Sequence, residues 1–196
     1  YTPNTLKDPE EDFVFGKGWS YGSELFIHKV KGRFTGWIGY TLSWTWRKFP
    51  SLNSGDKFPG KYDRRHDLSV VGTYQLNPKW TFSSVFVFGT GNAISLPERF
   101  YFIDGVLTQE FSRVNAYRMA PYHRLDISAT YTPVQKKKRW YKGSWVFSIY
   151  NVYSRLNPYF LYFDQQGSAA DGTLSVTTKQ VSLFPIIPSV TWNVHF

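Results

Sequence analysis

Residues Gly36 to Trp46 read Gly-Trp-Ile-Gly-Tyr-Thr-Leu-Ser-Trp-Thr-Trp. From Ile38 onward, a large apolar side chain occupies every second position, and glycine, threonine or serine stands between each pair. Successive side chains of a β-strand point to opposite faces, so this pattern predicts a strand with one apolar and one small, polar face. An amphipathic helix would instead repeat its apolar residues at spacings of three and four.

The same alternation recurs along the chain and predicts seven long strands. They cover about Trp19–Lys29, Thr35–Arg47, Asp67–Gln75, Trp80–Phe88, Leu125–Tyr131, Ser144–Tyr153 and Ser189–Phe196. Their connections alternate between short turns and long loops, and the long loops cover residues 50–64, 91–123 and 156–183. We expect the third loop to contain a hairpin with arms Tyr159–Phe163 and Leu174–Leu183. Outer-membrane barrels show this asymmetry, with short periplasmic turns and long extracellular loops.

Composition agrees with a membrane barrel. Aromatic residues make up 20% of the 196 residues, yet the mean hydropathy is −0.37. No apolar run approaches the roughly 18 residues of a spanning helix, whereas a barrel strand needs only about 9–11 residues with alternate positions apolar. The absence of cysteine excludes disulfides and thiolate metal sites.

Aromatic residues gather at the ends of the expected strands, as they do at the two interfaces of a bilayer. Predicted periplasmic ends carry Tyr74, Trp80, Tyr131, Trp140 and Phe196, and predicted outer ends carry Trp19, Trp44, Trp46, Phe86 and Phe88. A soluble β-sandwich would concentrate them in mid-strand. The predicted fold class is therefore all-β, an antiparallel transmembrane β-barrel segment with about seven spanning strands.

The net charge of +9 raises the question of a nucleic-acid partner. Apart from Lys136 to Arg139, however, the basic residues are scattered in turns and loops, and no nucleic-acid-binding motif accompanies them. We expect no nucleic-acid partner.

Several stretches resemble the C-terminal region of Bacteroidetes-type TonB-dependent receptors. They are Gly16–Gly22, Gly36–Trp44, Lys61–Ser69, Tyr122–Asp126, Phe147–Tyr153 and Val181–Ser189. The resemblance implies a barrel of about 22 strands. It also implies an N-terminal plug, a TonB box that receives energy from the inner membrane, bulky nutrients as substrates and, in some members, a surface lipoprotein lid.

Seven strands cannot close a single-chain bacterial barrel, which has an even strand number. Residues 1–196 are thus expected to be the C-terminal part of an outer-membrane β-barrel domain, without the plug domain or the TonB box. No secretory signal peptide stands at Tyr1, so the chain is expected to be mature, truncated or a fragment.

The final strand resembles the terminal signal that the barrel-assembly machinery reads. Val190, Trp192, Val194 and Phe196 alternate with polar residues, and the chain stops on phenylalanine. An unpaired edge strand of this kind can add to another sheet by β-augmentation. An ordinary last strand would have the same alternation.

Two groups of residues are candidates for contact with a substrate. Arg65 and Asp67 repeat as Arg124 and Asp126, each pair just below a long loop; an interstrand ion-pair ladder that braces the wall is the alternative role. The long loops also carry aromatic side chains that could bind a substrate or pack against one another, namely Phe58, Tyr62, Phe100, Tyr101, Phe102, Tyr159, Phe160 and Tyr162.

No catalytic residue, metal ligand or cofactor is expected. His66 and Asp67 are adjacent on one strand and point to opposite faces, so they cannot pair as in a hydrolytic triad. The four histidines lack metal-ligand spacing, and no nucleophile elbow or phosphate loop is present.

The expected function is the C-terminal barrel wall of a TonB-dependent transporter that imports a bulky nutrient across the outer membrane of a Gram-negative cell. Its expected partners are outer-membrane lipid, the rest of the barrel with its plug, TonB, the barrel-assembly machinery and a surface lipoprotein. The alternatives are a non-transporting barrel subunit that scaffolds a membrane complex, and a soluble carbohydrate-binding β-sandwich.

Replacing Leu42 by arginine tests the predicted faces. We expect Leu42→Arg to block membrane assembly, because an arginine facing lipid near the midplane costs about 2–4 kcal/mol. Thr41→Arg, on the polar face, should be milder. Heat-modifiable gel mobility measures assembly, and equal tolerance of the two changes would contradict the assignment.

Overall fold

The computed structural model describes residues 13–103, 106–111, 113–134, 142–167 and 171–195. Contacts divide them into two compact units. The loop unit comprises the described residues of 1–22, 43–64 and 92–119, and the sheet unit comprises those of 23–42, 65–91 and 120–196. The described residues contain no helix long and apolar enough to cross a membrane.

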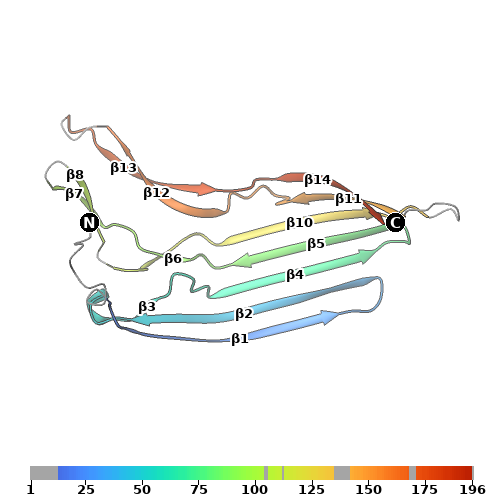
Figure 1. Cartoon of the computed structure of the whole chain (residues 1–196), viewed down its shortest axis with the longest axis horizontal. Helices are drawn as coiled ribbons and strands as arrows, with labels where there is room; N and C mark the ends of the chain where they lie inside the picture. The colour runs from blue at the N-terminus through green and yellow to red at the C-terminus, as the bar shows by residue number, and fades with distance from the viewer. Residues whose placement is uncertain (1–12, 104–105, 112, 135–141, 168–170, 196) are drawn as a thin grey trace. The chain divides into compact units, whose positions relative to one another are not determined.

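The seven predicted strands are confirmed. They are β1 (Lys17–Lys29), β2 (Phe34–Lys48), β4 (His66–Gln75), β5 (Trp80–Gly89), β10 (Tyr122–Tyr131), β11 (Lys142–Tyr150) and β14 (Ile187–His195). They lie side by side in chain order in one sheet, and neighbouring strands from β2 to β14 are antiparallel (Figure 1). The fold is therefore all-β and antiparallel, and the helical residues described are a 3₁₀ turn at Asn53–Gly55.

Two strand boundaries differ by three residues from the sequence-based expectation, and the others differ by two residues or fewer. β11 ends at Tyr150 rather than Tyr153, because Asn151 has a φ of 54°, which a strand cannot accommodate. β10 begins at Tyr122, inside the segment that was expected to be loop. Lys136 to Arg139, Trp140 and Phe196 lie outside the described residues.

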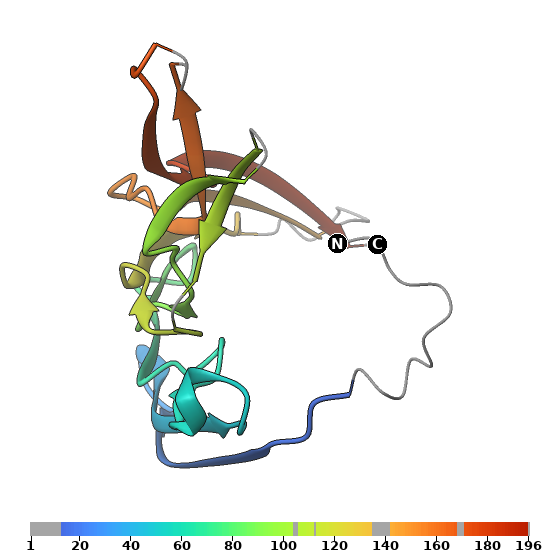
Figure 2. The same ribbon diagram turned by 90° about the vertical axis from the view of Figure 1, so that its left-hand side faces the viewer.

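The long loops are more structured than expected. Phe58–Pro59 (β3) pairs with β2, and Ala93–Ile94 (β6) pairs with Tyr117–Arg118 (β9). Arg99–Ile103 (β7) and Val106–Glu110 (β8) form a hairpin. The hairpin expected in the third loop is confirmed as Pro158–Gln166 (β12) and Ser175–Ser182 (β13), drawn as a two-stranded ribbon in Figure 2.

The strand register joins the predicted apolar positions into one continuous face. On this face Ile38 lies opposite Val70, Val70 opposite Phe86, and Phe86 opposite Leu125. Nearer the turns, an aromatic row crosses four strands through Trp80, Tyr131, Trp145 and Trp192. Neighbouring rings in this row lie close, with centroids 4.9 Å apart for Trp80 and Tyr131 and 5.7 Å for Trp145 and Trp192.

The opposite face is small and hydroxylated along most of the sheet unit. A row of hydroxyl side chains crosses five strands through Thr73, Ser83, Ser128, Ser148 and Ser189. Thr73 and Ser83 are hydrogen-bonded at 3.2 Å, and Ser148 and Ser189 at 2.7 Å. The alternating residues of the sequence therefore lie on opposite faces of the sheet, as predicted.

One aromatic cluster departs from that division. The rings of Phe26 and Trp37 lie on the hydroxyl-bearing side, with centroids 5.8 Å apart. They lie beside Gly39, where an added Cβ would come within 3.4 Å of the Trp37 ring. The glycine therefore gives these rings room against the backbone.

The apolar face of the sheet unit is uncovered. Among the described residues, the buried hydrophobic side chains are Phe58 and Ala93, both in the loop unit. Mid-sheet side chains remain largely open, with exposed fractions of 41% for Ile38, 40% for Ile127 and 44% for Phe147. Within the described residues, extensive contacts between strands are those between hydrogen-bonded neighbours, so no second layer packs on this face.

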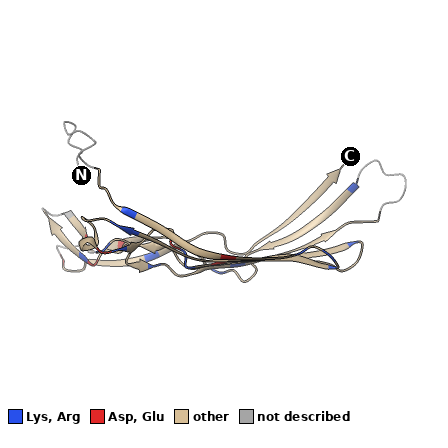
Figure 3. Ribbon diagram, turned by 90° about the horizontal axis from the view of Figure 1, so that it is seen from below, with Lys and Arg blue, Asp and Glu red and all other residues tan. Residues whose placement is uncertain are grey.

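Charged residues lie mainly at strand ends and in connections (Figure 3). β5 carries none, and β11 carries only its first residue, Lys142. Arg124 and Asp126 on β10 are the exception within the sheet unit's central strands, and both lie on the hydroxyl-bearing side.

Candidate functional site

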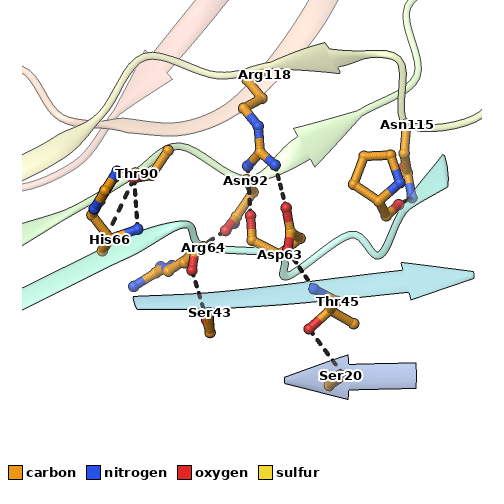
Figure 4. A network of polar contacts seen from close by, with 11 residues as sticks. Ser20, Ser43, Thr45, Asp63, Arg64, His66, Thr90, Asn92, Asn115 and Arg118 are labelled. Atoms are coloured by element: carbon orange, nitrogen blue, oxygen red, sulfur yellow. Dashed lines mark hydrogen bonds and ion pairs between the residues drawn. The ribbon is translucent and has the colours of Figure 1, made fainter. Parts of the chain in front are cut away.

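Asp63 is the centre of a polar network in the loop unit (Figure 4). Its side chain is 1% exposed. The backbone N–H of Thr45 donates to one carboxylate oxygen at 2.6 Å, and Arg118 forms an ion pair with the other oxygen. Arg118 also donates to the Asp63 carbonyl at 2.5 Å. A carboxylate this deeply buried needs such partners. Because they come from β2 and β9, they join these two strands to the segment before β4.

Three asparagines extend this connection between the two long loops of the loop unit. Asn53 pairs with the backbone of Val114, accepting its N–H at 2.7 Å and donating to its carbonyl at 3.1 Å. Asn115 donates to the Pro59 carbonyl at 2.9 Å, and Asn92 accepts from Arg64 at 3.3 Å. Residues 50–64 and 92–119 therefore support each other through side chains that replace backbone pairing.

Arg124 is the centre of a second cluster, on the hydroxyl-bearing side of the sheet unit. It contacts Asp126 of the same strand at 2.9 Å and donates to the hydroxyls of Tyr122 at 2.9 Å and Tyr150 at 2.6 Å. Its guanidinium carbon lies 4.1 Å from the centroid of the Tyr150 ring, a cation–π contact. Asp126 in turn accepts the backbone N–H of Asn151 at 2.9 Å.

The alternative role, an ion-pair ladder between strands, is therefore wrong for Arg124 and Asp126. Their ion pair lies within β10, between residues two apart on one face. The guanidinium contributes to holding the end of β11 through the Tyr150 hydroxyl and ring. In the first copy of this motif, Asp67 lies opposite Thr41 and Gly89 in the sheet, and neither Arg65 nor Asp67 is without a partner.

Two buried asparagines shape the connection that follows β11. Asn151, 1% exposed, donates to the carbonyls of Arg155 and Phe184, each at 3.0 Å. Asn157 binds the backbone of His123 on both sides, accepting its N–H and donating to its carbonyl, each at 2.9 Å. These two hydrogen bonds replace those of a neighbouring strand and hold the segment that precedes β12 against β10.

The β12–β13 hairpin presents the aromatic residues predicted from the sequence. Tyr159 is 64% exposed, and Phe160 and Tyr162 are 46% and 41% exposed. The three rings follow one another, with centroids 5.7 Å and 6.3 Å apart. Exposed rings in sequence on a paired strand form a surface that can stack on a flat ligand.

An ion pair crosses the same hairpin between Lys179 and Asp164, at 2.5 Å. The hydrogen bond from Lys179 lowers the pKa of the Asp164 carboxyl, and the same contact raises the pKa of the Lys179 ammonium. Because the folded-state pKa of Asp164 is lowered, its contribution is present above the ordinary carboxyl pKa and is lost as pH falls through the lowered value. The pair is exposed, so its contribution to stability is small.

The remaining aromatic candidates divide between surface and core. Tyr62 is 74% exposed, with the Lys61 ammonium 5.6 Å from its ring centroid, and Tyr101 on β7 is 43% exposed. Phe58 is not a surface residue. It is 4% exposed and stacks on Phe49 with centroids 6.1 Å apart, so of the two roles expected for the loop aromatics Phe58 has the packing role.

The C-terminal candidates lie on an edge strand. β14 pairs with β11 on one side, and no other described strand pairs with its second side. Val190 and Trp192 are 62% and 54% exposed on the apolar face, and Val194 shares that face. Phe196 lies outside the described residues, so the proposed assembly signal stays a prediction.

Sequence reasoning missed Arg118, Asn53 and the buried role of Asp63. Asn53 and Asn115, with φ values of 51° and 54°, stand in a backbone conformation that asparagine tolerates best after glycine, which is a weak signal. Within the described residues, no three histidine, cysteine, aspartate or glutamate side chains gather in a way that could hold a metal ion.

Comparison with protein-family models, with curated proteins and with solved structures found no match for the chain.

Removing the Arg118 cation tests the loop-unit network. We expect Arg118→Met to loosen residues 50–64 and 92–119, because breaking a buried ion pair from one side costs about 3–5 kcal/mol, less here since Arg118 is one-third exposed. Proteinase K cleavage in these segments should accelerate. Adding Asp63→Asn should recover part of the loss, and Arg113→Met is the matched control. No change in cleavage with Arg118→Met would contradict the role.

Proposed function

We propose that the chain forms part of the wall of an outer-membrane β-barrel, and that this barrel is a TonB-dependent transporter that imports a bulky nutrient. The observation that carries the proposal is the uncovered apolar face of the sheet unit. A groove of about 600 Å³ runs along it, lined by side chains such as Phe82, Ile127 and Phe147.

In water such a face is unfavourable, since each square ångström of apolar surface removed from water contributes about 25 cal/mol. A soluble sandwich would cover the face with a second sheet. The described residues supply no such layer, so the carbohydrate-binding sandwich has little support. Contact with lipid hydrocarbon stabilises the same face without a protein layer, while hydrogen bonding between strands satisfies the backbone.

The directions of the two edge strands support a wall within a larger barrel. β1 and β14 are the first and the last of seven long strands in the sheet order, and the direction reverses from each strand to the next. The two edges therefore run the same way (Figure 1) and cannot pair with each other in antiparallel fashion. Antiparallel closure needs an odd number of further strands, which removes both edges.

Two further features support a role in transport: the resemblance to TonB-dependent receptors and the aromatic residues of the loops. Loops that are positioned by a rigid scaffold and that expose aromatic rings are typical of binding surfaces. We assign Tyr159, Phe160 and Tyr162, with Tyr62 and Tyr101, to substrate contact, and Arg124 with Asp126 to bracing the wall beneath. The plug and the coupling to TonB would come from sequence outside residues 1–196. A coding sequence without a plug and a TonB box would favour the scaffold alternative.

Residues 1–196 contain no cysteine, so a cysteine introduced here reports alone once any cysteine elsewhere in the protein is replaced by serine, which gives a direct test of membrane orientation. The complete protein is produced in a Gram-negative host with either Gln166→Cys, at the end of β12, or Lys79→Cys, at the turn between β4 and β5. A membrane-impermeant maleimide should label Gln166→Cys in intact cells. Lys79→Cys should react only after the outer membrane is opened.

The complete protein without either introduced cysteine is the control for background labelling. Labelling of Lys79→Cys but not Gln166→Cys in intact cells would reverse the proposed orientation. Recovery of either variant in the soluble fraction would reject the membrane location.

A further inference from the structure

Lys17, Lys48 and Lys57 lie in the loop unit, where β1 begins and β2 ends. Tyr21 stacks on Trp44 with ring centroids 5.3 Å apart, and Ser20 donates to the Thr45 hydroxyl at 3.1 Å. Both contacts imply one antiparallel register, which places Trp19 opposite Trp46 and Lys17 opposite Lys48. The ammonium group of Lys57 lies 4.8 Å from the Trp46 ring centroid.

This arrangement is unfavourable for the isolated chain. Side chains directly opposite each other on neighbouring strands have Cβ atoms about 5 Å apart, and like charges in that position repel. All three lysines are exposed, and no carboxylate among the described residues forms an ion pair with any of them. An anion bound between them would relieve the repulsion.

The lysines also stand at a defined level along the strands. Ile38, Tyr40, Leu42, Trp44 and Trp46 form the apolar series of β2, and Lys48 is the next residue on that face. Lys17 precedes Trp19 and Tyr21 on β1 in the same way. Aromatic rings followed at once by cations match the boundary between hydrocarbon and headgroups, where polar rings and anionic phosphates meet.

We propose that Lys17, Lys48 and Lys57 bind the phosphate of an anionic lipid headgroup in the outer leaflet, with Trp46 and Trp19 beneath it. The inference rests on the proposed membrane location, because the occupant must reach the site from the bilayer. Each lysine donates to phosphate oxygens as a point charge, and the indole rings contact the first carbons of the lipid.

The test uses the complete protein, purified in detergent and incubated with diphosphorylated lipid A, and native mass spectrometry measures the lipid retained. Wild type should retain this lipid in preference to its dephosphorylated form. The triple variant Lys17→Gln/Lys48→Gln/Lys57→Gln should bind at least about tenfold more weakly, since each cation near an anionic surface contributes to affinity. The matched control is Lys29→Gln/Lys31→Gln/Lys79→Gln, with the same charge change at the other strand ends.

Equal retention by both triple variants, or no preference for the phosphorylated lipid, would overturn the proposal. Displacement by an equal concentration of inorganic phosphate would also overturn it, since the site would then take any phosphate. If the lysines instead neutralise the acidic stretch Asp8 to Asp12, wild type binds no lipid phosphate and the proposal fails. Heat-modifiable mobility of wild type distinguishes these outcomes from failure of the barrel itself: a protein that assembles in the membrane but retains no lipid leaves the proposed function intact.

Discussion

Hydrogen bonds between neighbouring strands satisfy the backbone of the inner strands of the sheet unit, but no described residue covers its apolar side chains. The rest of the structure depends on this contrast between a paired backbone and an uncovered apolar face. A single-layer sheet is stable only where lipid or another protein covers its apolar face. The cross-strand series from Ile38 through Val70 and Phe86 to Leu125 is continuous, so the requirement extends over the whole face and not over an isolated patch.

The polar clusters lie where regular pairing between long strands stops. Asp63 with Arg118 and Asn151 with Asn157 lie beyond the ends of long strands, and Arg124 with Asp126 lie on β10 next to the point where its ladder with β11 stops. There, side chains take over the pairing that the backbone can no longer provide. Loops held this way can present aromatic rings such as Tyr159 and Tyr162 from a firm base, which is what selective recognition requires.

The sequence predicted the seven long strands and the division of residues between faces, because a period of two is a local signal that survives without knowledge of the partners. It also predicted the β12–β13 hairpin from its two β-rich arms. It could not predict that Phe58 is buried, since that depends on Phe49 reaching it across a loop. Nor could it predict the ion pair of Asp63 and Arg118, whose residues are far apart in the chain. The Arg124–Asp126 pair was recognised as a motif, but the role of Tyr150 in it required the structure.

Contact between the apolar face and hydrocarbon can be measured residue by residue along β10. Nitroxide labels on single cysteines at positions 124–130 of the reconstituted complete protein report access to oxygen, which concentrates in lipid, and to a water-soluble nickel chelate. We predict a period of two, with oxygen access highest at Leu125, Ile127 and Ala129 and chelate access, or protection from both reagents, at Asp126, Ser128 and Thr130. Chelate access at Leu125, Ile127 and Ala129, or no period at all, would contradict it.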